Sequence, residues 1–151
     1  GFKIFITDDR KEFANEKRFP GVDKIISLKP EDAFLELPIN PNTFVVIATR
    51  GHRYDHIALK AAAITSASYV GLLGSKRKTI LVYEDLVKSG LSIDRIKEIR
   101  APIGLDIHAR TPAEIALSVM SEIMMFRLGG TGKPMKLEEW RVDKIFQKLK
   151  N

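Results

Sequence analysis

The chain has 151 residues, of which 44% are hydrophobic and 29% are charged, and it carries a formal net charge of +6 and no cysteine. This composition is typical of a soluble globular domain, and the lack of cysteine excludes disulfides, thiolate metal sites and cysteine nucleophiles within these residues. No apolar run approaches the roughly 18 residues that a bilayer span requires, and the first residues turn acidic too early for a signal peptide. We therefore expect a cytoplasmic protein without a membrane partner.

Apolar runs and helical patterns alternate along the first part of the chain. They predict, in chain order, a strand over 2–6, a short strand near 24–28, a strand over 44–48, a helix over 55–67, a strand over 68–73 and a helix over 75–88. The run FVVIA (44–48) is continuously apolar, which is typical of a parallel strand covered on both faces. Gly90 is expected to close the last of these helices.

The next part of the chain is predicted to be helical. A short helix is expected over 92–99, with a serine as its cap. The sequence TPAE gives the clearest helix start, because Thr111 stands at the cap, Pro112 at the first helical position and Glu114 at the position that completes a capping box. The helix that follows, to about Arg127, is apolar over most of its circumference and is therefore expected to be buried.

The segment GGTGKP (129–134) interrupts this pattern. It is not a Walker motif, because Arg127 occupies the position of the first glycine and Pro134 that of the serine or threonine. We interpret it as a linker to a final amphipathic helix over 137–149.

Strands that alternate with helices predict an α/β fold with a three-layer parallel sheet. In such sheets, ligands bind beyond the carboxyl ends of the strands. Three polar segments follow predicted strands in this chain: TDDR (7–10), TRGH (49–52) and GSKRK (74–78). We expect these segments to converge on one binding site.

The segment GLLGSKRK (71–78) predicts an anion site. It has no complete G-x-G-x-x-G fingerprint, yet Gly74 lets the backbone approach a ligand, and Ser75 can cap the helix and offer its hydroxyl. Lys76, Arg77 and the following lysine stand in the first helical turn, where cations are unfavourable unless an anion offsets them. This mismatch favours a phosphate or carboxylate site over the alternative, a solvated basic turn.

The other two segments each allow two interpretations. Asp8 and Asp9 follow a strand, as does the acid that accepts hydrogen bonds from a ribose, but aspartates are also common in solvated turns. Thr49, Arg50 and His52 supply a hydroxyl, a guanidinium and an imidazole for a polar ligand. The alternative is a surface turn ahead of a helix.

A metal site is not expected in this chain. His52 and His56 have the i, i+4 spacing of two helical ligands, but the acid and the third ligand of a zinc motif are missing. In the alternative to a ligand site, Asp55 only caps the following helix and His52 is a surface residue.

Several segments resemble the XdhC/CoxI family of accessory proteins. TRGHRYD (49–55), YVGLLGSKRK (69–78) and APIGLDIHARTPAEIALSVMSEI (101–123) are similar to its C-terminal Rossmann-like half, as are GFKIFITDDRKEFAN and RFP upstream. The similarity runs from residue 1 to about residue 128, so we expect one Rossmann-like domain over 1–128, followed by a linker and an amphipathic helix over 129–151.

This resemblance implies a maturation factor for molybdenum hydroxylases such as xanthine dehydrogenase. Members of the family are held to bind the molybdenum cofactor, to protect it while a cysteine desulfurase partner installs its sulfido ligand, and to help deliver it to the apoenzyme. We accordingly expect a non-catalytic module that binds molybdenum cofactor or an adenine dinucleotide. The residues expected to bind it follow strands: Asp8 and Asp9 toward a ribose or the pterin, Thr49, Arg50 and His52 along the cleft, and Gly74, Ser75, Lys76 and Arg77 toward phosphate.

The chain departs from the family pattern in three respects. The N-terminal half of the family, with its cysteine, has no counterpart, the first Rossmann strand and its glycine-rich turn are missing, and His108 stands where the family usually has glycine. The sequence is therefore expected to be a fragment, one of several chains, or a protein whose other segment lies elsewhere.

The missing strand has a physical consequence, because the first strand of a Rossmann sheet lies at its centre. The strands over 2–6 and 44–48 are expected to leave a gap of about 10 Å between their axes, with unpaired backbone groups along both. We expect another polypeptide segment to fill the gap, whether a companion chain, an N-terminal piece or a swapped partner in a homo-oligomer.

Two other functions are open to the same sequence. An NAD(P)-dependent oxidoreductase would use His52 or Tyr54 as a proton donor and would need the turn that binds pyrophosphate. A nucleic-acid binder is suggested only by the basic excess. With 8% aromatic residues and none among residues 76–78, the chain offers no stacking surface, so we expect no nucleic-acid partner.

Overall fold

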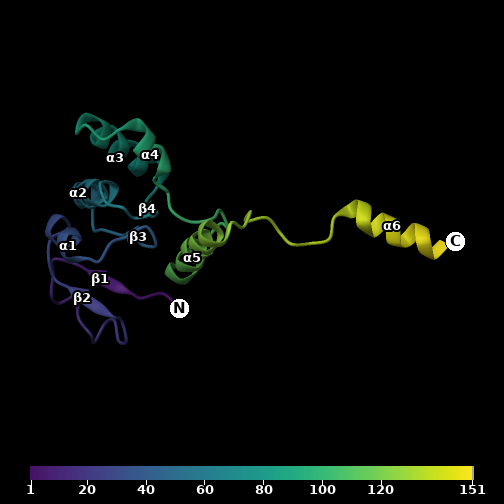
Figure 1. The fold of residues 1–151 in the computed structure, drawn as a ribbon, viewed down its shortest axis with the longest axis horizontal. Coiled ribbons are helices and arrows are strands. Elements are labelled where there is room, and N and C mark those ends of the chain that lie inside the picture. The colour runs from purple at the N-terminus through teal and green to yellow at the C-terminus, as the bar shows by residue number, and fades with distance from the viewer. Residues whose placement is uncertain (151) are drawn as a thin grey trace. The chain divides into compact units, whose positions relative to one another are not determined.

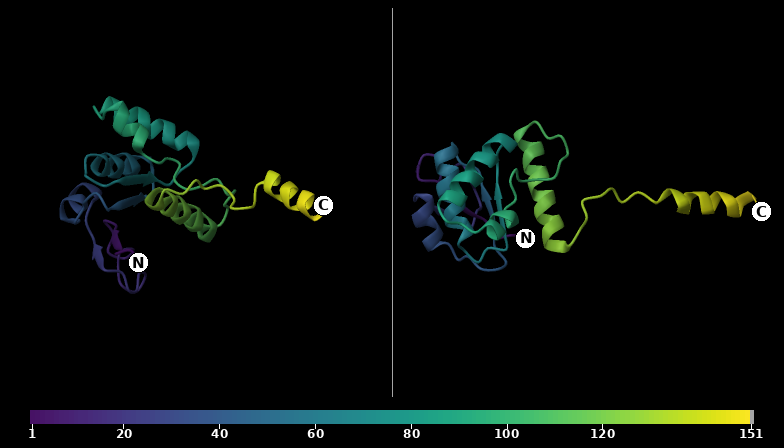
Figure 2. Two further views of the ribbon diagram at one scale, coloured as in Figure 1. Left: turned by 45° about the vertical axis from the view of Figure 1, so that its right-hand side comes forward. Right: turned by 90° about the horizontal axis from the view of Figure 1, so that it is seen from above.

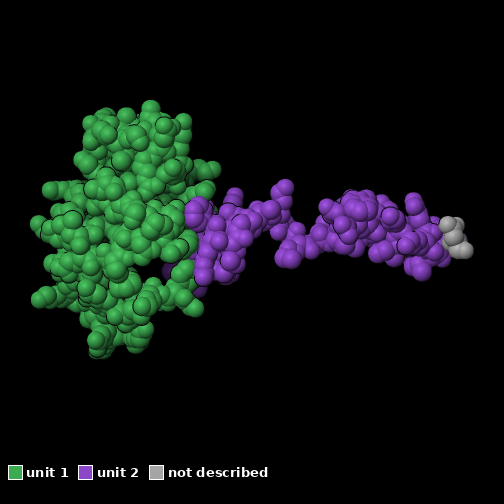
Figure 3. Space-filling model, in the orientation of Figure 1, with its two compact units in different colours: residues 1–104 green, residues 105–151 purple. Residues whose placement is uncertain are grey.

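The structure is a computed structural model that describes residues 1–150. It divides after Gly104 into two compact units, which Figure 3 shows in different colours. The first unit contains, in chain order, β1 (Phe5–Thr7), β2 (Lys24–Ile26), α1 (Pro30–Glu36), β3 (Phe44–Ile47), α2 (His52–Ala63), β4 (Tyr69–Leu72), α3 (Lys76–Lys88) and α4 (Ile93–Glu98). The second unit contains α5 (Pro112–Leu128) and α6 (Glu139–Lys150).

The strands form two parallel pairs. β1 pairs with β2, which sets Phe5 opposite Lys24, and β3 pairs with β4. Arg100 forms a parallel bridge to Gly71 and thereby extends the second pair beyond β4. Within the described residues, no ladder of hydrogen bonds joins β1 to β3.

The order of these strands is that of a Rossmann sheet. Figure 1 shows β1 between β2 and β3, so the order across the unit is β2, β1, β3, β4 and then Arg100. This corresponds to positions 3, 2, 4, 5 and 6 of the order 3-2-1-4-5-6. The expected fold class, a Rossmann-like α/β fold with parallel strands, is confirmed, and so is the expectation that strands 2–6 and 44–48 do not pair directly.

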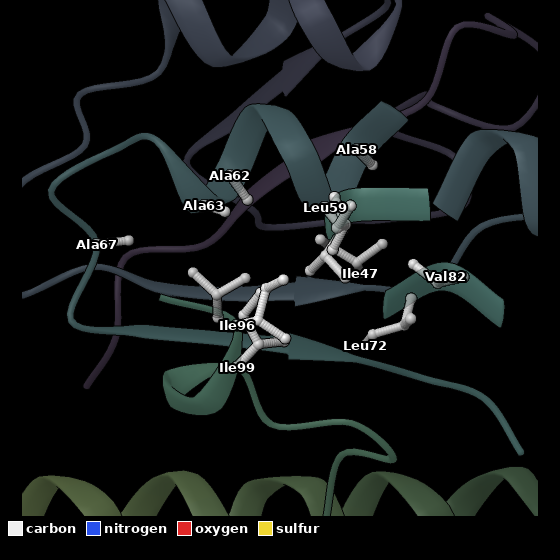
Figure 4. Close-up of a cluster of buried hydrophobic side chains, with 12 residues drawn as sticks. Ile47, Ala58, Leu59, Ala62, Ala63, Ala67, Leu72, Val82, Ile96 and Ile99 are labelled. Atoms are coloured by element: carbon white, nitrogen blue, oxygen red, sulfur yellow. The ribbon is translucent and has the colours of Figure 1, made fainter. Parts of the chain in front are cut away.

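The core of the first unit lies between the β3–β4 pair and the helices. α2 packs against β3 and β4 and lies beside both α1 and α3 (Figures 1 and 2). Small and branched side chains point toward one another in this core (Figure 4): Ile47, Ala58, Leu59, Ala62, Ala63, Ala67, Val70, Leu72, Val82, Leu86, Ile96 and Ile99. Because alanine side chains are small, α2 packs close to the strands. This packing places the first residues of α2 beside the carboxyl end of β3.

The expected starts of α3, α4 and α5 are confirmed, whereas α2 begins at His52 rather than at residue 55 and α6 begins at Glu139 rather than at residue 137. The Ser75 and Ser92 hydroxyls each accept a hydrogen bond from a backbone N–H three residues later, both at 3.2 Å. Thr111 and Glu114 form the predicted capping box at the start of α5. Helix α1 is not predicted from the sequence, and its start has no side-chain cap.

Two expectations of complete burial are wrong for the described chain. On β3, Ile47 is buried but Val46 is 47% exposed, so only one face of this strand is covered. On α5, Val119 and Ile123 are buried, whereas Leu117 is 61% exposed. β3 is apolar throughout and α5 is apolar over most of its circumference, but the described residues cover only one side of each.

The remaining backbone features are local. His108, which stands where the family usually has glycine, adopts a φ of 58°, a left-handed conformation that favours glycine. None of the helices in residues 1–150 is both long enough and apolar enough to cross a membrane.

Gly71 allows the chain after Arg100 to lie across β4. A Cβ added at Gly71 would lie 2.7 Å from Ile103 Cγ1, closer than carbon atoms can approach. Ile103 is itself buried, so it cannot move aside into solvent. The absence of a side chain at Gly71 is therefore a packing requirement of the fold.

We predict that Gly71→Ala lowers the free energy of unfolding by about 1–3 kcal/mol, because the added methyl group overpacks a filled site. Gly51→Ala is the matched control. Its φ of 173° is ordinary extended backbone and an added Cβ meets no atom within 4 Å, so the change should stay within about 0.5 kcal/mol. Urea denaturation measures both, and equal stability of the two variants would contradict the packing argument.

Candidate functional site at the carboxyl ends of the strands

The three polar segments expected at strand ends lie along one edge of the first unit. Near the starts of β1 and β3, the Phe2 and Phe44 rings meet edge to face with their centroids 5.8 Å apart. Beyond the ends of the same strands, Arg50 Nη2 lies 3.1 Å from Asp9 Oδ2. β1 and β3 therefore run in the same direction, and their carboxyl ends lie at a common edge.

Asp8 is held by Arg10, a residue that sequence reasoning missed. The Asp8 carboxylate accepts hydrogen bonds from Arg10 Nε and Nη2, both at 2.9 Å, and from the Arg10 backbone N–H at 3.0 Å. Hydrogen bonding to the Arg10 side chain lowers the pKa of Asp8 below its ordinary value of 3.8. The Arg10 guanidinium already donates two hydrogen bonds to the Asp8 carboxylate. A ribose hydroxyl would therefore have to compete with Arg10 for this carboxylate.

Asp9 and Arg50 connect the ends of β1 and β3. Their ion pair at 3.1 Å is partly exposed, and the Arg50 guanidinium also lies over the ring of Tyr54, 4.2 Å from its centroid. Arg50 therefore already has an anionic and an aromatic partner in this structure. Its predicted role along the cleft stays a prediction.

A buried carboxylate connects β3, α2 and α3. The Asp55 side chain is fully buried, and its Oδ1 accepts a hydrogen bond from Thr49 Oγ1 at 2.6 Å. Its Oδ2 forms an ion pair with Lys78 Nζ. Asp55 is therefore not the helix cap that the alternative interpretation of this segment expected. Its buried carboxylate instead pairs with the partly exposed Lys78.

The sequence contained a signal for this role of Asp55. Asp55, Ala58, Leu59 and Ala62 follow the i, i+3, i+4, i+7 spacing of one helix face, so the aspartate stands on the stripe that faces the core. A charged residue on such a stripe needs a buried partner. The sequence did not identify which of the three basic residues 76–78 would supply it.

The start of α3 presents basic side chains to solvent. Ser75, Lys76 and Arg77 are exposed, and the Ser75 hydroxyl accepts the Lys78 backbone N–H as a helix cap. The first turn of α3 holds no acidic residue, and in the described chain neither Lys76 nor Arg77 takes part in an ion pair. A Cβ added at Gly74 would meet the flexible side chain of Lys78 at 3.1 Å.

The two histidines of α2 have different surroundings. His52 Nε2 lies 3.9 Å from Asp85 Oδ2 on α3, and the Nε2 atom of His56 is buried without a hydrogen-bond partner. In the part of the chain that the structure describes, no group of three or more His, Cys, Asp or Glu side chains could hold a metal ion.

The comparisons with known proteins agree with this architecture. The chain is 35% identical over 133 residues to "Uncharacterized protein YqeB" of Escherichia coli (strain K12), a match that covers 87% of the chain and 24% of that protein. It is 32% identical over 127 residues to a probable xanthine dehydrogenase subunit of Bacillus subtilis (strain 168), covering 84% and 36%. It is 33% identical over 104 residues to "Molybdenum cofactor insertion chaperone PaoD" of E. coli (strain K12), covering 69% and 32%.

A solved structure and a family model give the same result. The crystal structure of a xanthine dehydrogenase from Bacillus halodurans matches with a TM-score of 0.73 and 29% identity, over 87% of this chain and 37% of that one. The chain spans between 24% and 36% of the length of the curated relatives it matches. The model of the XdhC Rossmann domain matches residues 1–123, and the chain therefore belongs to the XdhC family.

Proposed function

We propose that the chain takes part in the maturation of a molybdenum hydroxylase and binds molybdenum cofactor by its phosphate at the start of α3. The relatives named for xanthine dehydrogenase and for molybdenum cofactor insertion support this role. The observation that carries the binding site is the exposed basic first turn of α3, which follows Gly74 and the Ser75 cap.

The chemistry of this turn fits a phosphate. Lys76 and Arg77 are cations at the positive end of a helix dipole, an arrangement that is unfavourable unless an anion lies beside it. The free backbone N–H groups of a helix start are natural phosphate donors, and glycine before the turn lets the ligand come close. Molybdenum cofactor carries a phosphate, and in some forms a dinucleotide, so its anionic end suits this turn.

The three basic residues of α3 divide into two roles. Lys78 is 27% exposed and forms an ion pair with the buried Asp55, so the charge of Lys78 is already compensated within the protein. Lys76 and Arg77 are exposed and are available to a ligand. When the cofactor is bound it supplies the molybdenum centre, while the chain binds and orients the phosphate.

The partners in this proposal are those that the family resemblance implies. The hydroxylase apoenzyme would receive the cofactor, and a cysteine desulfurase would act on the cofactor while the chain holds it.

An adenine dinucleotide would use the same phosphate contacts, which makes a nicotinamide-dependent oxidoreductase the second candidate. The two possible proton donors of such an oxidoreductase both have partners in the structure: the Tyr54 ring lies against the Arg50 guanidinium, and His52 lies near Asp85.

We predict that the double variant Lys76→Ala and Arg77→Ala binds molybdenum cofactor at least about 30-fold more weakly, since two charge-assisted contacts of about 1–3 kcal/mol each are lost. The cofactor is released from a purified molybdenum enzyme without oxygen, and bound molybdenum is measured after equilibrium dialysis. Lys60→Ala, an exposed lysine of α2, is the control and should bind as the unaltered chain does. Unchanged affinity of the double variant would overturn the site. Tighter binding of NAD than of the cofactor would favour the oxidoreductase.

We also predict that Lys78→Ala lowers the free energy of unfolding by about 3 kcal/mol, because it leaves the carboxylate of Asp55 buried without its cation. Lys76→Ala, two positions earlier on the same helix, should change it by less than about 0.5 kcal/mol. Guanidinium denaturation at neutral pH compares the two variants. Equal effects would show that Lys78 has no structural role distinct from that of Lys76.

A further inference from the structure

Helix α6 carries an apolar stripe that the described residues leave exposed. Val142, Ile145, Phe146 and Leu149 follow the i, i+3, i+4, i+7 spacing of one helix face. None of the described α6 side chains is buried, and Phe146 is 60% exposed and Leu149 78% exposed. A helix of 12 residues is marginal in water unless it packs against a partner. The α6 stripe, defined by these four residues, therefore needs a surface on which to pack.

Helix α5 offers such a surface. Its buried side chains lie on one face, and the opposite face carries an exposed stripe, the α5 stripe, which consists of Leu117, Met120, Met124 and Leu128. The α5 stripe runs along about three helical turns and the α6 stripe along about two, so the first is long enough to cover the second. Methionine side chains are flexible and adapt to the shape of a partner.

The charges at the ends of the two helices favour an antiparallel arrangement. In α5 the first turn contains Glu114 and the last turn contains Arg127. In α6 the first turn contains Glu139 and the last turn contains Lys148 and Lys150. A parallel arrangement would bring like charges together at both ends, whereas an antiparallel one brings opposite charges together at both ends. The stripes and the end charges are therefore complementary in one orientation.

The segment between the two helices allows α6 to reach another molecule. Residues 133–138 are all exposed and belong to no helix or strand. Pro134 favours an extended backbone at the residue before it, and six extended residues span about 20 Å. The exchange of such a segment between two copies is a low-cost route to a dimer.

We infer that the α6 stripe of one copy packs antiparallel on the α5 stripe of a second copy, and that the reciprocal contact forms at the same time about a two-fold axis. Each copy carries both stripes, so a second copy supplies the complement of each. Helix α6 lies beyond residues 1–123, which the family model matches, so this contact is a feature of the chain outside the shared domain.

The first test measures the oligomeric state of the whole chain by sedimentation equilibrium. We expect a dimer whose dissociation constant rises at least about 30-fold in Phe146→Glu and in Met124→Glu, because each variant places a charge within an apolar contact. Both side chains are exposed in the single chain, so neither change disturbs its core. Gln147→Glu, on the opposite face of α6, is the matched control and should dimerise as the unaltered chain does. A monomer at all concentrations, or a dimer that Phe146→Glu leaves unchanged, would overturn the inference.

The second test distinguishes exchange between copies from packing of α6 on α5 within one chain, and it uses the absence of cysteine. Two single variants, Ala113→Cys in α5 and Lys150→Cys in α6, are mixed and treated with a bis-maleimide that spans about 10 Å, the distance between packed helices. We expect cross-links between the two chains to form at least tenfold faster than in a control mixture of Ala113→Cys with Glu139→Cys, at the other end of α6.

Two results of the second test would overturn the inference. Equal rates in the two mixtures would exclude the antiparallel contact. In a double variant with Ala113→Cys and Lys150→Cys in one chain, efficient cross-linking within that chain at concentrations below the dimer dissociation constant would show that α6 packs on its own α5. The start of α3 is not altered in either test, so failure here leaves the proposed function to its own experiment.

Discussion

The pairing of one buried carboxylate organises the edge of the protein at which the candidate site lies. Asp55 lies on the core face of α2, where an unpaired charge would cost several kcal/mol. Thr49 reaches it from the end of β3, and Lys78 reaches it from the first turns of α3. A single side chain thus fixes three segments relative to one another, and the proposed anion site depends on their arrangement.

Some charged side chains at this edge have a partner of opposite charge within the protein, and others are exposed to solvent without one. At the β1 side of the edge, Arg10 and Arg50 hold Asp8 and Asp9, so the ends of the first strand carry paired charges. At the α3 side, the charge of Lys78 is taken by Asp55, whereas its two basic neighbours stand in solvent at a helix start. We therefore propose the start of α3, rather than the end of β1, as the place where an anionic ligand would bind at this edge.

Local chemistry was sufficient to predict much of this fold. The serine caps and the capping box at Thr111 depend on residues close in sequence, and the structure confirms them. The strands also lie in the apolar runs that predicted them, although β1 covers 5–7 rather than 2–6 and β2 covers 24–26 rather than 24–28. The pairing of Asp55 with Lys78 was not predicted, because it joins two helices and periodicity identifies a face without naming its partner. For the same reason the exposure of Val46 and of one side of α5 was missed: an apolar pattern indicates that a surface needs cover, and the cover itself lies elsewhere in the fold.

The central claim is that the first turn of α3 holds an anion. Its most direct test is a titration of the isotope-labelled chain with inorganic pyrophosphate, followed by the backbone amide resonances in NMR spectra. The account predicts saturable shifts that are largest at Ser75, Lys76 and Arg77 and that weaken as salt is added. Shifts of equal size at the exposed lysines of α6, or none at the start of α3, would contradict it.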